Sequence, residues 1–133
     1  MICRGISPSA APGKTPEDWR KSFYYHFYEY PGWHFVKRHY GVRTERYKLM
    51  HFYHDIDAWE LYDLKTDPAE MNNVYGNPDY AEVQEKMTQE LKRVQEKCGD
   101  SHDRALEIVG QYPHGSLPGW YKGAKTGANK QKR

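Results

Sequence analysis

The sequence has few of the aliphatic side chains that usually fill a protein core. Isoleucine, leucine, valine and phenylalanine provide about 15% of the 133 residues, below the roughly 20% at which disorder becomes a serious interpretation. A disordered chain also needs a high net charge, whereas the formal charge here is +2. The composition therefore does not describe a fully disordered chain, and another type of side chain must supply the core.

Long hydrophobic runs and cysteines are scarce as well. No apolar run reaches the roughly 18 residues of a membrane-spanning helix, so we expect no membrane partner. Residues 1–13 lack the apolar stretch of a secretory signal, so we expect no signal peptide, and the localisation stays open. Two cysteines, Cys3 and Cys98, cannot form the framework of a disulfide-rich fold, and we expect two unpaired thiols.

Aromatic residues take the place of the missing aliphatic ones. The chain has 12 tyrosines, 4 tryptophans and 4 phenylalanines, and 14 of these aromatic residues lie between Phe23 and Tyr62. A core of this kind buries many hydroxyl groups, and each of them needs a hydrogen-bond partner. We therefore expect an aromatic core confined to the middle of the chain.

Composition divides the chain into three parts. Residues 1–14 are rich in glycine, proline, serine and alanine without a period, which is typical of a loop or a disordered segment. Residues 15–109 hold the periodic segments and are predicted to form the folded domain. Residues 110–133 hold five basic residues and no acidic one, so we expect a disordered basic tail. Basic tails can bind nucleic acid, but most are solvated, and we expect no nucleic-acid partner.

Four short segments alternate in the manner of β-strands. In the first of them Phe23, Tyr25 and Phe27 fall on one face, and aromatic residues also occupy the other face. Both faces are therefore expected to be covered, whereas a small antiparallel sheet usually leaves one face in water. The connections are short, which indicates an antiparallel meander. The expected strands are Ser22–Tyr30, His34–Thr44, Arg46–His54 and Trp59–Leu64.

A long helix is predicted after the strands. Asn77 is a good N-cap, Pro78 suits the first helical position, and Gly99 can end the helix in a left-handed cap. Between them, apolar residues recur at steps of three and four and form one stripe. Shorter helices are expected over Pro68–Val74 and, for a turn or two, over Asp100–Val109. The segments predict the α+β class, with a three- to four-stranded antiparallel sheet packed by one long C-terminal helix.

One group of residues has the chemistry of a metal site. His51, His54, Asp55 and Asp57 provide two imidazoles and two carboxylates in a short segment. However, His51 and His54 would point to opposite faces of a strand, and aspartates are common in turns. We therefore interpret the group as a solvated turn and predict no metal ligand. The motifs of zinc proteases, paired-cysteine zinc sites, P-loops and nucleophile elbows are absent from the sequence.

The chain reversal within Tyr28–Tyr40 is the candidate binding segment. It combines aromatic faces with histidine and arginine donors, and this combination suits a sugar or an anionic ligand. The same residues also fit a hairpin tip beside core tyrosines, and composition leaves both interpretations open. The candidate ligand contacts are His39, His34, Trp33, Tyr30 and Arg38.

Four blocks of the sequence resemble the C-terminal end of type I, formylglycine-dependent sulfatases. The blocks are YYHFYEYP from Tyr24, HYGVRTERYKL from His39, WELYDL from Trp59 and DPAEMNN from Asp67. They are most similar to bacterial glycan sulfatases of the N-acetylglucosamine-6-sulfatase and iduronate-2-sulfatase types. In that family this region is a four-stranded antiparallel sheet with a long terminal helix, packed against a large α/β catalytic domain. The resemblance thus implies a C-terminal fragment of a sulfuric ester hydrolase, with an N-terminal catalytic domain as its partner.

The catalytic groups of that family are absent from this sequence. These sulfatases use a cysteine or serine in a C/S-x-P-x-R motif, oxidised to formylglycine, and a calcium ion held by Asp-Asp and Asp-Asn pairs. Neither the motif nor either pair occurs here, so the resemblance implies a chain without a cofactor that is inactive alone. It also implies that the Tyr30–His39 segment faces a sulfated glycan, with His39 as the first contact. The parent family is typically periplasmic, extracellular or lysosomal.

A free-standing carbohydrate- or anion-binding module is the alternative function. It would use the same reversal, with its aromatic and histidine side chains, and it would act without a catalytic domain. Titration of the isolated chain with sulfated glycans is the measurement that bears on this alternative.

Overall fold

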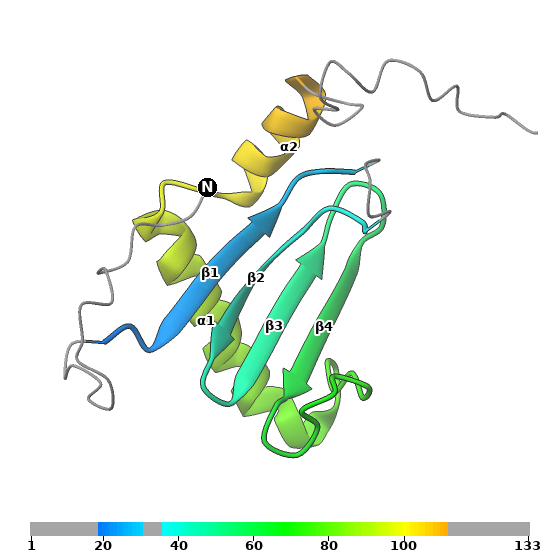
Figure 1. The fold of residues 1–133 in the computed structure, drawn as a ribbon, viewed down its shortest axis with the longest axis vertical. Coiled ribbons are helices and arrows are strands. Elements are labelled where there is room, and N and C mark those ends of the chain that lie inside the picture. Colours follow the sequence, from blue (N-terminus) through cyan, green and yellow to red (C-terminus); the bar gives the residue numbers. More distant parts are fainter. Residues whose placement is uncertain (1–18, 31–35, 112–133) are drawn as a thin grey trace, which may run out of the picture.

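The computed structural model describes residues 19–30 and 36–111, which form a four-stranded sheet and two α-helices (Figure 1). The strands are β1 (Ser22–Phe27), β2 (His39–Thr44), β3 (Tyr47–Phe52) and β4 (Ala58–Asp63). A short 3₁₀ helix, η1 (Pro78–Tyr80), leads into α1 (Ala81–Lys97), and α2 (His102–Gln111) follows. The expected α+β class, a sheet with one long helix, is confirmed.

The strands form an antiparallel meander in the order β1-β2-β3-β4. Tyr25 pairs with Gly41, and Gly41 pairs in turn with Met50, so one row of residues runs across the first three strands. β1 ends earlier than alternation predicted because the backbone turns at Glu29, where the Tyr30 N–H donates to the Tyr28 carbonyl at 2.9 Å. The pairing of β1 with β2 therefore begins only at His39.

Alternation of the side chains gives the sheet two different faces. One face packs against α1 and forms the main core, to which α2 and the segment before η1 also contribute. The buried core residues are Tyr24, Tyr40, Val42, Leu49, Tyr53, Leu61, Val74, Met87, Leu91, Val94, Ala105 and Val109. Tyrosines thus do supply part of the core, as the composition predicted.

The opposite face of the sheet is covered by no described helix and is turned toward the viewer in Figure 1. We name it the open face; its residues are Phe23, Tyr25, Phe27, His39, Gly41, Arg43, Lys48, Met50, Phe52, Glu60 and Tyr62. It is aromatic, and the His39 ring centroid lies 5.0 Å from that of Phe52 and 5.5 Å from that of Phe27. A solvent-facing side of an antiparallel sheet is usually polar, so this face is unusual for a small domain.

The boundaries of α1 follow the sequence signals. The Asn77 side chain accepts a hydrogen bond from the Asp79 N–H at 3.0 Å, and Gly99 adopts φ +65° after the last turn. α1 lies behind the sheet in Figure 1 and contacts β1, β2 and β3, and its buried residues Met87, Leu91 and Val94 belong to the core. α2 then continues to Gln111, two residues beyond the end expected for the folded domain.

The segment Pro68–Val74 is not helical, so the short helix expected there is wrong. Asn73 accepts a hydrogen bond from the Leu61 N–H at 2.9 Å and donates one to the Trp59 carbonyl at 3.1 Å. Glu70 has φ +55°, which a right-handed helix excludes. The segment lines the edge of β4 instead, because these tertiary hydrogen bonds outweigh its local helix-start signals.

The cysteine expectation also needs correction. Cys98 is disulfide-bonded, so the prediction of two unpaired thiols is wrong. The other cysteine of the sequence, Cys3, lies outside the described residues. Sequence spacing says nothing about whether two thiols reach bonding distance, and this explains the error. No helix within residues 19–30 and 36–111 is long and apolar enough to cross a membrane.

Candidate functional site

The predicted contacts that the structure describes gather at one end of the sheet, where β1 and β3 finish and β2 and β4 begin (Figure 1). We name this region the loop end; it comprises residues 28–30, 36–39 and 53–57. Tyr30, Arg38 and His39 belong to it, whereas Trp33 and His34 lie outside the described residues. The chain reversal thus brings its described candidates to one edge of the domain.

Tyr30 is paired with a lysine that was not among the predicted contacts. The Lys37 ammonium donates a hydrogen bond to the Tyr30 hydroxyl at 2.6 Å and lies 4.0 Å from the centroid of the ring. A cation in this position is attracted to the negative face of the ring. The pair therefore holds a positive charge on an aromatic surface at the loop end.

Arg38 is buried, with 2% of its surface exposed. Its Nη1 donates to both carboxylate oxygens of Asp55, at 3.1 and 3.0 Å, and its Nε donates to the Tyr28 carbonyl at 3.3 Å. Breaking a buried pair of this kind is strongly destabilising, because one charge is left uncompensated. Arg38 thus ties together the segments that follow β1 and β3, and this geometry favours a positioning role over ligand contact.

His39 lies where the loop end meets the open face. Its Nδ1 is 2.8 Å from the Lys37 carbonyl, and because a carbonyl only accepts, Nδ1 carries the proton. Its ring is also set edge-on to that of Tyr25, at 5.9 Å and 73°. The ring orientation and tautomer are therefore fixed, and Nε2 is the atom that a ligand could use.

A buried network that sequence reasoning missed joins β1 and the residue after β3 to the turn between the helices. The Asp100 carboxylate accepts from the Tyr24 hydroxyl at 2.7 Å and from His26 Nδ1 at 2.8 Å. His26 Nε2 then accepts from the Tyr53 hydroxyl at 2.5 Å. Burial raises the pKa of Asp100, but the hydrogen bonds from His26 and Tyr24 outweigh it and hold that pKa at about 2. Burial lowers the pKa of His26, so the network contains an ionised aspartate and a neutral imidazole.

A second network lies beside the first. His51 Nε2 donates to Asp57 at 2.8 Å, and its Nδ1 accepts from the Tyr40 hydroxyl at 2.8 Å. That hydroxyl accepts in turn from His102 Nδ1, at 3.1 Å, and so links β2 and β3 to α2. The order of groups is that of an Asp-His-hydroxyl relay. However, burial raises the pKa of Tyr40 to about 12 and leaves it 4% exposed, so its hydroxyl is not an accessible nucleophile.

The four residues considered as metal ligands form separate pairs. His51 bonds to Asp57, whereas His54 Nδ1 lies 3.7 Å from Asp55, whose carboxylate is engaged by Arg38. Within residues 19–30 and 36–111, no three histidine, cysteine, aspartate or glutamate side chains converge to hold a metal ion.

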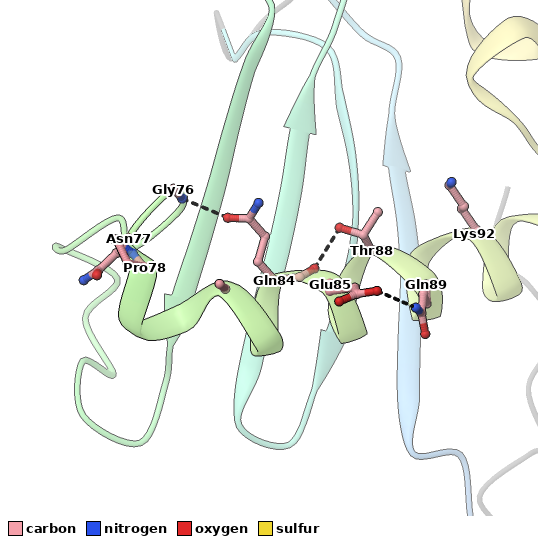
Figure 2. Close-up of a pocket in the computed structure, with 9 residues that line it drawn as sticks. Gly76, Asn77, Pro78, Gln84, Glu85, Thr88, Gln89 and Lys92 are labelled. Atoms are coloured by element: carbon pink, nitrogen blue, oxygen red, sulfur yellow. Dashed lines mark hydrogen bonds between the residues drawn. The ribbon is translucent and has the colours of Figure 1, made fainter.

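A shallow pocket of about 410 Å³ lies on the outer side of α1, at the end of the sheet opposite the loop end (Figure 2). Several of its polar groups already bond one another: the Gly76 N–H donates to Gln84, and the Thr88 hydroxyl donates to the Gln84 carbonyl, both at 2.8 Å. The lining residues are Gly76, Asn77, Pro78, Ala81, Gln84, Glu85, Thr88, Gln89 and Lys92. Because no charged or catalytic group is buried in it, we assign no site there.

Comparison with known sequences identifies relatives of the chain. The family described as N-sulphoglucosamine sulphohydrolase, C-terminal, matches residues 4–97. The N-acetylglucosamine-6-O-sulfatase of Bacteroides thetaiotaomicron is 55% identical over 97 residues, which are 73% of this chain and 17% of that protein. The sulfatase resemblance read from the sequence blocks is thereby confirmed.

Solved structures share the fold. A protein in complex with its substrate, D-glucosamine-2-N,6-O-disulfate, is 57% identical, with a TM-score of 0.65 over 68% of this chain and 18% of its own. The phosphonate monoester hydrolase of Agrobacterium radiobacter is 28% identical, with a TM-score of 0.52 over 65% of this chain and 19% of its own. The chain thus spans less than a fifth of the length of the relatives named here.

Proposed function

We propose that this chain, which belongs to the N-sulphoglucosamine sulphohydrolase C-terminal family, forms the substrate-facing C-terminal part of a sulfatase that acts on a sulfated glycan. The observation that carries the proposal is the grouping of Tyr30, Lys37 and His39 at the loop end. The Tyr30 ring and the Lys37 ammonium suit a sugar that bears an anionic group, and His39 Nε2 can accept a hydrogen bond from a sugar hydroxyl. One similar protein is named an N-acetylglucosamine-6-O-sulfatase, and another was solved in complex with a disulfated glucosamine as its substrate. Both names support this class of substrate.

Each predicted contact receives a role in this proposal. His39 offers Nε2 to the sugar, since its Nδ1 is engaged by the Lys37 carbonyl. Tyr30 presents its ring as a stacking surface, and we assign the same role to Trp33 and a donor role to His34 from their residue types. Arg38 acts through Asp55 and positions the segment that carries these contacts.

Hydrolysis itself is assigned to the remainder of a sulfatase. The sequence contains no C/S-x-P-x-R motif and no Asp-Asp or Asp-Asn pair, so its residues do not fit formylglycine or the calcium ion of the family. The buried Tyr40 and Tyr53 hydroxyls are engaged by histidines and are not nucleophiles. In this proposal the chain binds and orients the sugar, and no bond-breaking step passes through it.

The open face is the surface that we assign to the catalytic domain. The Tyr25 hydroxyl is buried there without a hydrogen-bond partner in the described part of the chain. Burial raises the pKa of Tyr25 well above its usual range, and Glu70 and Glu60 raise it further, so the hydroxyl stays protonated and can donate. The hydroxyl lies beneath other atoms of this chain, so a docked domain would contact the aromatic rings of the open face, and leaving the hydroxyl unpaired costs roughly 1–3 kcal/mol.

A chimera tests the proposal. This chain would replace the matching C-terminal region of the Bacteroides thetaiotaomicron N-acetylglucosamine-6-O-sulfatase, and sulfate release from N-acetylglucosamine-6-sulfate would be measured. We expect an active chimera in which His39→Ala lowers kcat/KM about tenfold, the factor for one lost hydrogen bond of about 1.4 kcal/mol.

Lys92→Ala, at the exposed side of α1, is the matched control and should leave kcat/KM unchanged. A folded chimera that keeps full activity with His39→Ala and with Tyr30→Ala would contradict the substrate-facing role.

A further inference from the structure

His39 lies in a row of three rings that crosses the sheet. The β1–β2 register pairs it with Phe27, and the β2–β3 register pairs it with Phe52. Directly paired residues of neighbouring strands stand on the same face, and their side chains contact one another. Since β2 lies between β1 and β3 (Figure 1), the imidazole has a phenyl ring on each side.

The three rings are packed against one another. The planes of Phe27 and His39 are 24° apart at a centroid distance of 5.5 Å, and those of His39 and Phe52 are 41° apart at 5.0 Å. The Tyr53 N–H donates to the Arg38 carbonyl, so the next pair along, His39 with Phe52, is a non-hydrogen-bonded pair, in which side chains approach most closely. We name Phe27 and Phe52 the phenyl clamp.

The phenyl clamp and the backbone together select one orientation of the imidazole. Phenyl rings offer no side-chain nitrogen or oxygen to His39, and Tyr25 meets it edge-on at 5.9 Å. The hydrogen bond of Nδ1 therefore goes to the Lys37 carbonyl, at 2.8 Å. A ring freed from this carbonyl could carry its proton on either nitrogen, so the packing that holds the ring also holds the tautomer.

The other ring nitrogen of His39 is accessible. Within residues 19–30 and 36–111, the Tyr25 hydroxyl is the one side-chain nitrogen or oxygen atom that is buried without a hydrogen-bond partner. His39 Nε2 has no partner among those residues either, so it reaches solvent. In the neutral ring it accepts a hydrogen bond and donates none, so it suits a hydroxyl or N–H group but not a sulfate oxygen.

We propose that Phe27 and Phe52 are positioning residues that keep His39 Nε2 as an acceptor for a hydroxyl or N–H group of the sugar. Neither residue was predicted as a site residue from the sequence. The proposal rests on the proposed function for the sugar, whereas the clamp rests on the strand register and the ring contacts. The sulfate group of the same sugar must then meet other donors, and the Lys37 ammonium is one at the loop end.

Nitrogen-15 NMR of the histidine rings in the full chain tests the clamp, because it distinguishes protonated from unprotonated ring nitrogens. We expect the wild-type His39 to carry its proton on Nδ1. Phe52→Leu and Phe27→Leu remove a ring and should each shift the His39 signals toward a mixture of the two tautomers. Phe52→Tyr keeps the ring and should retain the wild-type signals. Phe23→Leu, at a residue of the same face that is 39% exposed, is the matched control and should retain them too.

Activity of the chimera tests whether the clamp acts through His39. If Phe52→Leu lowers the fraction of rings in the binding orientation to one third, kcat/KM should fall about threefold. In a His39→Ala chimera the same substitution should have no further effect, because residues that act as a unit are not additive. A simple loss of packing would instead lower kcat/KM equally in both backgrounds.

The outcomes separate this proposal from the proposed function. Unchanged His39 signals in Phe52→Leu and Phe27→Leu overturn the clamp, and so does a wild-type ring with its proton on Nε2. Equal losses of kcat/KM in the two backgrounds also overturn it. If His39→Ala lowers kcat/KM while the signals stay unchanged in both leucine variants, the proposed function is retained without the clamp. Altered signals in a chain whose His39→Ala chimera keeps full activity reject the recognition of the sugar by His39. Should Phe52→Leu not fold, Phe27→Leu and the wild-type signals decide.

Discussion

The buried tyrosine hydroxyls show how single residues make an aromatic core possible. Tyr24 donates to Asp100, Tyr40 to His51, and Tyr53 to His26, all at 2.8 Å or less. Burying a hydroxyl without a partner is costly, so each of these tyrosines needs a polar group beside it. Asp100, His26 and His51, whose side chains are buried, therefore act as part of the core.

Gly41 is the residue at which the sheet tolerates no side chain. A Cβ atom there would lie 2.5 Å from the Leu49 carbonyl oxygen and 2.6 Å from the Tyr25 hydroxyl. We expect Gly41→Ala to lower the free energy of unfolding by about 1–3 kcal/mol, as overpacked cores do. Urea unfolding measures this.

Gly110→Ala is the matched control, because an added Cβ in α2 meets nothing within 4 Å. It should leave stability unchanged or raise it by about 0.5–1 kcal/mol. Equal effects of the two substitutions would contradict the close approach of Tyr25 to Gly41.

The ionisation of Asp100 makes the stability of the folded chain depend on pH. Because its pKa falls from 3.8 to about 2 on folding, the stability it contributes is present above about pH 4 and is lost as the pH falls to about 2. This loss should amount to about 1–2 kcal/mol. Asp100→Asn should lower stability at pH 7 and flatten the pH dependence between pH 4 and 2.

Thermal melts between pH 7 and 2 measure that dependence. Asp103→Asn, on the exposed first turn of α2, should follow the wild-type curve within about 0.5 kcal/mol. An Asp100→Asn variant with the wild-type acid dependence would show that the carboxylate is not ionised in the network.

Local sequence signals predicted the strands and the helix whose formation depends mainly on neighbouring residues. Alternation located four strands, and the cap residues Asn77 and Gly99 located the long helix. The helix predicted over Pro68–Val74 is absent because Asn73 forms hydrogen bonds with strand β4, a contact that no local pattern reveals.

The candidate site was predictable to a similar extent. The chain reversal within Tyr28–Tyr40 pointed to the loop end from the sequence, whereas His39 was expected as the first contact only from the family resemblance. The link from His26 to Asp100 joins residues far apart in the chain, so sequence reasoning missed it.

The same leucine-to-alanine substitution should have unequal effects in the two helices, because one leucine is buried and the other is exposed. Leu91 in α1 is 2% exposed against the sheet, whereas Leu106 in α2 is 40% exposed. We expect Leu91→Ala to lower the free energy of unfolding by about 2–5 kcal/mol, through lost burial and a residual cavity. Leu106→Ala should cost less than about 0.5–1 kcal/mol. Urea denaturation of both variants checks this, and equal losses would contradict the packing of α1 on the sheet.

Among the residues that the structure describes, the sheet has apolar residues on both faces but a helix layer on one. α1 and α2 contribute to the core on one side, while the open face presents aromatic rings. The chain spans 17% of the curated relative, so most of that relative is available to cover such a face. This asymmetry explains why the composition is low in aliphatic residues without being that of a disordered chain.

Charge reversal on the open face tests the docking of a catalytic domain. Arg43 is exposed on that face, and Arg43→Glu should weaken association with the separately produced N-terminal part of the Bacteroides thetaiotaomicron relative by roughly tenfold. The melting temperature of the isolated chain should stay within the change expected for a surface substitution, about 0.5 kcal/mol in stability. Lys92→Glu, at the outer side of α1, makes the same charge change away from the open face. Calorimetry measures the association of the two parts. If the separate N-terminal part does not fold, the melting temperatures of chimeras that carry each variant are compared instead. If Arg43→Glu and Lys92→Glu behave alike in that measurement, the open face is not the docking surface.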